Sequence, residues 1–230
     1  MRTWMALGIA FLGFSLAARA QEDPKQKFTE AQKQNRAALM QYTWKTRTEL
    51  AMKGETKSVK QEQVRYDIDG KPHKTPIGGA PEPATEEQPA RRGRRGGRVK
   101  EKIIENKKEE FAELMKSLGE LVGSYGHLPP DKLQAFVQNA TLTPGQGSLE
   151  IRGASVLQEG DSLTVQIDTA TYMTRRVEIR TALEGKPVTA TSDYRALSNG
   201  PTYQARSVLE YPDKEIVLTI ENFDYQKLGQ

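Results

Sequence analysis

The amino-acid sequence predicts an α+β protein in which helices cover one face of a curved antiparallel sheet, a half-open β-barrel. Hydrophobic and polar residues alternate with a period of two over 42–68 and again over 148–220, which is typical of strands with one buried face. Between these parts, over 99–139, hydrophobic residues recur at helical spacing. Turn residues separate the later strands at intervals of about ten residues, which indicates an antiparallel meander.

The first twenty residues have the pattern of a secretory signal peptide. A positive start at Arg2 is followed by an uncharged apolar run over 4–16, and the small residues Ala18 and Ala20 mark a cleavage site after Ala20. The apolar run is short for a membrane-spanning helix. We therefore expect residues 1–20 to be removed and the mature protein, which begins at Gln21, to be periplasmic.

The composition excludes several classes of chemistry. The chain has 230 residues and no cysteine, which excludes disulfides, thiolate zinc sites, a cysteine nucleophile and lipid attachment through a cysteine. Its net charge of +4 falls by two when Arg2 and Arg19 leave with the signal peptide, and so balanced a charge favours no particular partner. The remaining roughly 210 residues suffice for one domain of generous size or two small ones.

The segment 21–77 predicts a helix and a β-hairpin. Good helix formers with few apolar residues occupy 24–40, which predicts a helix with a thin apolar face. Side chains then alternate along 42–52, and a turn at 53–55 leads to a return strand over 57–68. Val59 is out of phase with the rest of that strand, so we expect a bulge or a solvated strand end there. A turn at Asp69-Gly70 and a short third strand near 74–77 complete this part.

Residues 78–98 break the alternating pattern. This stretch is rich in proline and glutamate and then in arginine and glycine, a composition that cannot form a core. We interpret it as a disordered loop that is inserted between two ordered parts of one domain.

The segment 99–230 predicts two helices followed by a meander of strands. The apolar stripe that begins at Ile104 predicts a helix from about 99, which ends in the glycine- and proline-containing stretch 123–130, and a second helix follows over 131–139. We expect these helices to cover a sheet of about eight strands and to act as its lid. The later strands are predicted at 148–151, 161–168, 175–183, 187–194, 202–211 and 215–220.

The order of these elements resembles the family of periplasmic lipoprotein carriers and outer-membrane lipoprotein receptors, together with the related anti-sigma regulators of envelope stress. The likeness lies mainly in 173–225, with the runs "TRRVEIRTALEGKPVTATSDY", "NGPTY" and "EIVLTIENFDY", and in the strand 42–52 after an N-terminal helix. The resemblance implies an incomplete β-barrel closed by helices, with an apolar cavity between them. The chain departs from the family in its Arg-Gly insertion, and it lacks the lipidated cysteine of the receptor branch, so a receptor role is not expected.

The inner face of the first hairpin, together with the central helices, is the candidate ligand-binding site. Aromatic and methionine side chains suit an acyl chain because they are apolar and adaptable. The same side chains could instead pack on each other as a closed core, and the sequence leaves both possibilities open. Thr46 and Thr48 lie on this apolar face and need partners, which favours an accessible cavity. The predicted lining residues are Tyr42, Trp44, Leu50, Met52, Tyr66, Phe111, Met115, Leu118 and Phe136.

A basic run is the second candidate site. The run lies within 91–98, and together with Lys100 and Lys102 it has seven positive charges in twelve residues, a pattern that binds polyanions. In an exported protein we expect an anionic membrane surface or an acidic envelope protein as the partner, and no nucleic acid. The run could also be a flexible loop that is simply solvated by its charges. Its arginines are Arg91, Arg92, Arg94, Arg95 and Arg98.

No enzyme is predicted. His73 and His127 are the only histidines, they lie far apart in predicted loops, and no known catalytic or phosphate-binding motif is present, so we expect no catalytic residue, metal or cofactor. The sequence therefore favours a monomeric exported protein that binds a lipid or lipoprotein acyl chain, as a carrier or a sensor. The alternative is a closed-core module that interacts with a protein or a membrane through the basic run.

Overall fold

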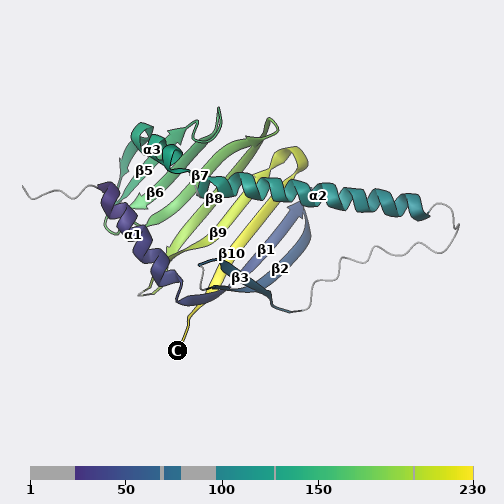
Figure 1. The fold of residues 1–230 in the computed structure, drawn as a ribbon, viewed down its shortest axis with the longest axis horizontal. Helices are drawn as coiled ribbons and strands as arrows, with labels where there is room; N and C mark the ends of the chain where they lie inside the picture. Colours follow the sequence, from purple (N-terminus) through teal and green to yellow (C-terminus); the bar gives the residue numbers. More distant parts are fainter. Residues whose placement is uncertain (1–23, 68–69, 79–96, 127, 199, 230) are drawn as a thin grey trace, which may run out of the picture.

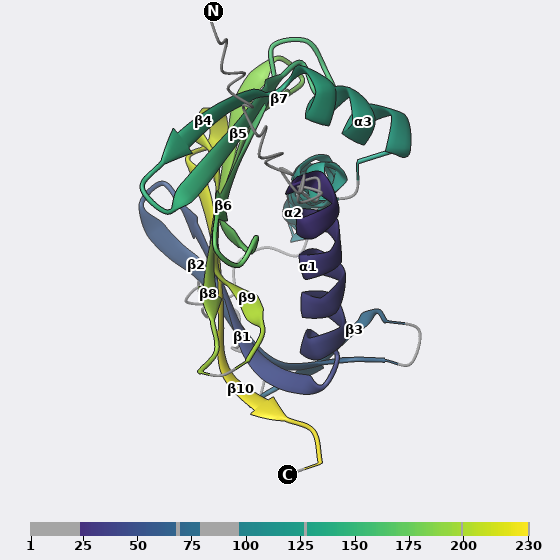
Figure 2. The ribbon, with the colours of Figure 1, turned by 90° about the vertical axis from the view of Figure 1, so that its left-hand side faces the viewer.

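The computed structural model describes residues 24–67, 70–78, 97–126, 128–198 and 200–229. Within these residues, three α-helices lie on one side of a ten-stranded antiparallel sheet (Figures 1 and 2). The helices are α1 (Pro24–Leu39), α2 (Gly97–Gly126) and α3 (Pro130–Asn139). The strands are β1 (Tyr42–Met52), β2 (Glu55–Tyr66), β3 (Pro72–Pro76), β4 (Thr141–Gly145), β5 (Ser148–Ala154), β6 (Ser162–Asp168), β7 (Thr174–Leu183), β8 (Lys186–Ala196), β9 (Thr202–Tyr211) and β10 (Ile216–Lys227).

The strand order joins the two halves of the chain into one sheet. The order is β3-β2-β1-β10-β9-β8-β7-β6-β5-β4, so the N-terminal hairpin pairs with the last strand through β1 and β10. Figure 2 shows the sheet as a curved layer with α1, α2 and α3 on its concave side. The predicted curved antiparallel sheet with covering helices is thus confirmed. The sheet is open, with β3 and β4 as its two edges, and strands outweigh helices in the fold.

Alternation of side chains determines which face of each strand is buried. In β1, Trp44 and Thr46 are buried beneath the helices, whereas Arg47 on the opposite face forms ion pairs with Glu49 and Glu221. The turn between β1 and β2 places Lys53 and Gly54 at φ of 56° and 75°, a conformation that a tight antiparallel hairpin requires and that glycine adopts readily.

Most predicted elements are present, with changes at their ends. The bulge predicted near Val59 lies two residues away, because Leu50 pairs with Ser58 and Ala51 pairs with Thr56, which leaves Lys57 as the extra residue. Strand β4 was not predicted because Pro144 argues against a strand, yet proline is tolerated at a sheet edge, where β4 lies. Strand β10 runs seven residues beyond the predicted end at Ile220, to Lys227.

Several sequence predictions fall on residues that the structure does not describe. The predicted signal peptide at 1–20 lies outside the described residues, and so does 79–96 of the predicted Arg-Gly loop. Helix α2 begins at Gly97, so Arg98 is helical and the prediction that the loop includes it was wrong. No helix among the described residues is long and apolar enough to cross a membrane.

The closed part of the core lies between the sheet and the C-terminal half of α2. Leu118 of α2 is completely buried against a cluster formed by β8, β9 and β10, and Tyr125 at the end of α2 packs with α3 against β6, β7 and β8. Figure 1 shows that α2 crosses the sheet and runs past β1 and β2 at its N-terminal end. Helix α1 crosses another part of the concave face, and the two helices therefore cover separate regions of the sheet.

Candidate ligand-binding site

A cavity of about 240 Å³ lies between α1 and the concave face of the sheet. Helix α1 contributes Gln32, Asn35 and Leu39 to its wall. The described residues that line it are all uncharged, and five of them are aromatic, so the surface suits a ligand that is mostly apolar. The aromatic residues, which come from β1, β2, β8, β9 and β10, are Trp44, Tyr66, Tyr194, Tyr203 and Tyr225.

Trp44 is the centre of the aromatic cluster. Its ring stacks on that of Tyr225 with the centroids 5.5 Å apart and an angle of 7° between the planes, and it meets Tyr66 at 5.2 Å and 52°. Tyr203 in turn contacts Tyr225 at 4.3 Å. A bulge in β10 makes the stack possible: Thr43 pairs with Gln226 and Lys45 with Phe223, so two residues of β10 lie opposite Trp44.

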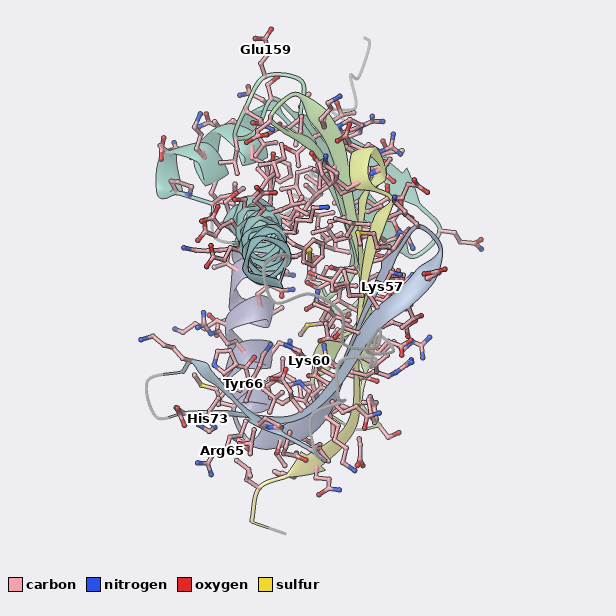
Figure 3. All side chains as sticks on the ribbon, turned by 90° about the vertical axis from the view of Figure 1, so that its right-hand side faces the viewer. Lys57, Lys60, Arg65, Tyr66, His73 and Glu159 are labelled. Carbon is pink, nitrogen blue, oxygen red and sulfur yellow. The ribbon has the colours of Figure 1, made fainter. Side chains whose placement is uncertain are left out.

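Tyrosine side chains in this cavity are half-buried. Burial raises the pKa of Tyr194, and it raises the pKa of Tyr66 even though the nearby charge of Arg36 acts in the opposite direction. Burial likewise raises the pKa of Tyr225, and the neighbouring Tyr66 and Tyr203 raise it further. All three side chains are therefore neutral at physiological pH and can donate a hydrogen bond. Figure 3 labels Tyr66, which lies on the side of β2 toward α1.

A row of hydrogen-bonded polar side chains separates the cavity from the core beneath α2. Thr46 Oγ1 donates to Asn222 Oδ1 at 2.7 Å, and Asn222 Nδ2 donates to the carbonyl of Gln204 at 2.8 Å. The amide of Gln204 continues the row by donating to Ser192 Oγ at 2.9 Å. Because Asn222 and Gln204 also line the cavity, its floor is polar while its walls are aromatic. Thr46 has therefore found a partner within the protein.

Polar contacts hold α1 over the cavity. Asn35 forms a two-way pair with the backbone of Thr202, donating to its carbonyl at 2.7 Å and accepting from its N–H at 2.7 Å. Gln32 Nε2 donates to the carbonyl of Tyr172 at 3.2 Å, and the ammonium of Lys27 lies 6.0 Å from the centre of the Tyr172 ring. Tyr172 has a φ of 56°, which is unusual for a bulky residue.

A larger groove of about 740 Å³ adjoins the cavity on the other side of Asn35. Thr174 and Tyr194 line both spaces, so the two are neighbours, and the groove also has charged residues, Asp168, Arg175 and Lys227. Asp168 accepts hydrogen bonds from the backbone of Thr171 and Ala170 and forms an ion pair with Arg175.

The pKa of Asp168 falls from 3.8 to about 2. The backbone hydrogen bond from Thr171 is the largest cause and outweighs the opposing effect of burial, and the Arg175 guanidinium lowers the pKa further. The carboxylate is therefore ionised at physiological pH, and it holds the guanidinium of Arg175 at the groove.

The structure divides the predicted lining residues among four places. Trp44 and Tyr66 line the cavity beneath α1, and Tyr42 lines the adjoining groove. Phe136 packs in the cluster beneath α3 and the end of α2. The remaining predicted residues pack together in the core beneath α2: Leu50, Met52, Phe111, Met115 and Leu118. That they bind a ligand stays a prediction for all nine.

The predicted basic site lies almost entirely outside the described residues. Arg91, Arg92, Arg94 and Arg95 fall within 79–96, and Arg98 lies in the first turn of α2. Its role toward a membrane or an acidic protein stays a prediction. Among the residues that the structure does describe, no group of three or more His, Asp or Glu side chains could hold a metal ion.

Sequence reasoning missed the residues that complete the cavity. Tyr194 and Tyr203 were placed in predicted strands, and Tyr225 lies beyond the predicted end of the last strand at Ile220. Nothing in the alternation indicated that these tyrosines would meet Trp44. The contribution of α1 was also missed, since Asn35 looks like an ordinary exposed residue of a polar helix. The thin apolar face of α1 was the available signal, because a helix of that kind must lie on something larger.

Among the comparisons with known proteins, only the one with solved structures finds similar proteins. No protein-family model matches the sequence, and no curated protein matches it. The chain is similar to the crystal structure of a LolA superfamily protein from Nitrosomonas europaea, with 12% identity, a TM-score of 0.40 and coverage of 89% of this chain and 94% of that one. It is also similar to a DUF1329 family protein from Desulfovibrio piger, with 10% identity, a TM-score of 0.39 and coverage of 90% and 95%.

A LolA superfamily structure is thus among those that this chain is similar to, as the resemblance in the sequence predicted. What the cavity binds depends on the residues of this chain.

Proposed function

We propose that this protein binds the acyl chain of a lipid or a lipoprotein in the cavity beneath α1 and acts as a carrier or a sensor in the cell envelope. The observation that carries the proposal is an uncharged, aromatic-lined cavity that opens beside a larger groove with charged residues. An apolar chain in the cavity meets rings that it can contact closely, while the polar remainder of the ligand can lie in the groove.

The energy of binding would come from removing the chain from water. Burial of each methylene contributes about 0.8 kcal/mol, so even part of an acyl chain gains several kcal/mol before the costs of association. The cavity is smaller than a typical ligand pocket of roughly 300–1,000 Å³, whereas the adjoining groove falls within that range. A long chain would therefore extend from the cavity into the groove, past Asn35.

Release of the ligand would require α1 to move. Helix α1 is held by the Asn35 and Gln32 contacts with the backbone, whereas α2 is held by Leu118 and its neighbours in a closed core. The sequence suggested the helices over 99–139 as the moving lid. We propose α1 instead, because it covers the cavity and because separating polar contacts in water costs less than opening an apolar core.

Native mass spectrometry of residues 21–230, purified from the periplasm of a Gram-negative host without detergent, tests this function. We expect a species that is heavier by the mass of a lipid and that disappears after organic extraction. Thr174→Trp would fill the space between cavity and groove and should remove this species. Thr164→Trp is the matched control, because Thr164 pairs with Glu178 on the convex face, and it should retain the lipid.

The proposal fails if the folded protein has only its bare mass and takes up neither phospholipid nor an acylated peptide on incubation. It also fails if Thr174→Trp and Thr164→Trp retain lipid equally, because the ligand would then lie elsewhere.

A further inference from the structure

Three tyrosine hydroxyls in the cavity lack a hydrogen-bond partner among the residues that the structure describes. Among the described residues, the hydroxyls of Tyr66, Tyr194 and Tyr225 make no hydrogen bond, although burial raises the pKa of each. Within the same described residues, every fully buried side-chain nitrogen or oxygen has a hydrogen-bond partner. None of these three hydroxyl oxygens is therefore fully buried, and each remains accessible to water or to a ligand.

The three hydroxyls limit what can fill the cavity. A plain hydrocarbon would displace the water around them and leave each hydroxyl unpaired in an apolar environment, which costs free energy. A ligand that brings an acceptor avoids this cost. A neutral hydroxyl at high pKa is a donor, so the group that best complements it is an uncharged acceptor.

We propose that the ligand places the carbonyl of its ester or amide linkage in the cavity beneath α1, where the hydroxyls of Tyr66, Tyr194 and Tyr225 surround it and donate to it. This inference rests on the proposed function and adds to it the chemical class of the ligand. It assigns the site to an acyl ester or acyl amide, with the linkage near Trp44, and distinguishes it from an alkyl chain that lacks the carbonyl.

The distribution of charge supports a neutral linkage in the cavity. Among the described residues, none that lines the cavity is charged, and Arg36 acts on Tyr66 from outside this lining. An anionic headgroup in the cavity would therefore lack a counter-charge in direct contact, and burying an unpaired charge is costly. Arg175 and Lys227 line the adjoining groove instead. A carbonyl is an acceptor without net charge, and in a lipid it lies between the apolar chain and the polar head. With the carbonyl in the cavity, the polar head can lie in the adjoining charged groove.

A matched pair of lipids tests the inference. Lysophosphatidylcholine with one acyl ester chain is compared with its alkyl-ether analogue of equal chain length, which differs by the missing carbonyl oxygen. We expect the protein, as residues 21–230, to bind the ester about tenfold more tightly in a calorimetric titration, which corresponds to one or two hydrogen bonds. Tyr194→Phe and Tyr225→Phe should each reduce this ratio toward one, because they weaken the binding of the ester relative to that of the ether.

Tyr172→Phe serves as the control, since Tyr172 lies outside the cavity, and it should keep the preference for the ester. Thermal unfolding shows whether each variant is folded. Equal affinity of the unsubstituted protein for ester and ether overturns the inference, and so does a preference that both cavity variants retain. If neither lipid binds, the proposed function fails as well, so the two failures are distinct.

Discussion

Replacement of Asn35 by alanine should loosen α1 from the sheet without unfolding the rest of the protein. Asn35 makes two hydrogen bonds of 2.7 Å to the backbone of Thr202, and alanine can make neither. Each such bond contributes about 0.5–1.5 kcal/mol net, so the docking of α1 should weaken by about 1–3 kcal/mol. Since 1.4 kcal/mol is a factor of ten, the undocked population of α1 should rise about tenfold to a hundredfold.

Hydrogen exchange read by mass spectrometry measures this change. Peptides from α1 should exchange about tenfold to a hundredfold faster in Asn35→Ala, whereas peptides from β8 and β9 should exchange at the unsubstituted rate. Bound lysolipid should dissociate faster by a similar factor. Lys33→Ala is the matched control, because Lys33 is an exposed residue of the same helix that lines neither the cavity nor the groove.

Unchanged exchange of α1 in Asn35→Ala would refute the reasoning, because it would mean that α1 does not depend on this contact. Equally faster hydrogen exchange throughout the sheet would also refute it, because α1 and the core would then open as one unit.

Three further results are expected. Asp161→Ala should lower the free energy of unfolding in urea by about 3 kcal/mol. The reason is that the carboxylate accepts hydrogen bonds from three successive backbone N–H groups and from the Tyr125 hydroxyl. A loss below about 1 kcal/mol would contradict this. The pKa of Asp168 is lowered from 3.8 to about 2, so the stabilising contribution of its carboxylate is complete above about pH 4 and is lost as the pH falls to about 2. Asp168→Asn should therefore reduce the decline in stability over that range. An identical decline in the variant would exclude Asp168 as a cause. Gly153→Ala should cost about 1–3 kcal/mol in chemical denaturation, since the new Cβ would lie 2.5 Å from the Phe136 ring, and an undiminished stability would show that the ring moves freely.

The sequence predicted the strands well, because one buried face imposes alternation. Strand β1 was predicted with its observed ends because it alternates along its whole length and ends at turn residues. The ends of β9 were also predicted, from the turn residues that flank it, although a bulge at Ala205 interrupts its pairing with β8. The C-terminal part of β10 was missed because polar residues outnumber apolar ones there. A bulge opposite Trp44 also interrupts its pairing with β1, and Tyr225 at that bulge packs on Trp44 in the cavity beneath α1.

The site depends on contacts that alternation does not encode. Alternation indicates which face of β1 has Trp44, but only the pairing of β1 with β10 places Tyr225 against it, and a bulge then sets the stacking. Similarly, the pattern of apolar residues in a strand is the same over a packed core and over a cavity. The difference lies in the covering helix, since α2 supplies Leu118 to the core while α1 supplies Asn35 to the cavity wall.

The central claim is that an acyl chain binds beneath α1 and not in the core beneath α2. Of the two tryptophans in the chain, Trp4 lies in the predicted signal peptide, so residues 21–230 contain Trp44 alone, at the centre of the proposed site. The most direct measurement is the fluorescence of Trp44 during titration with lysophosphatidylcholine that has a nitroxide on its acyl chain. The account predicts saturable quenching at the stoichiometry of one lipid per protein, reversed by unlabelled lipid. Binding of the labelled lipid that leaves Trp44 unquenched would contradict it.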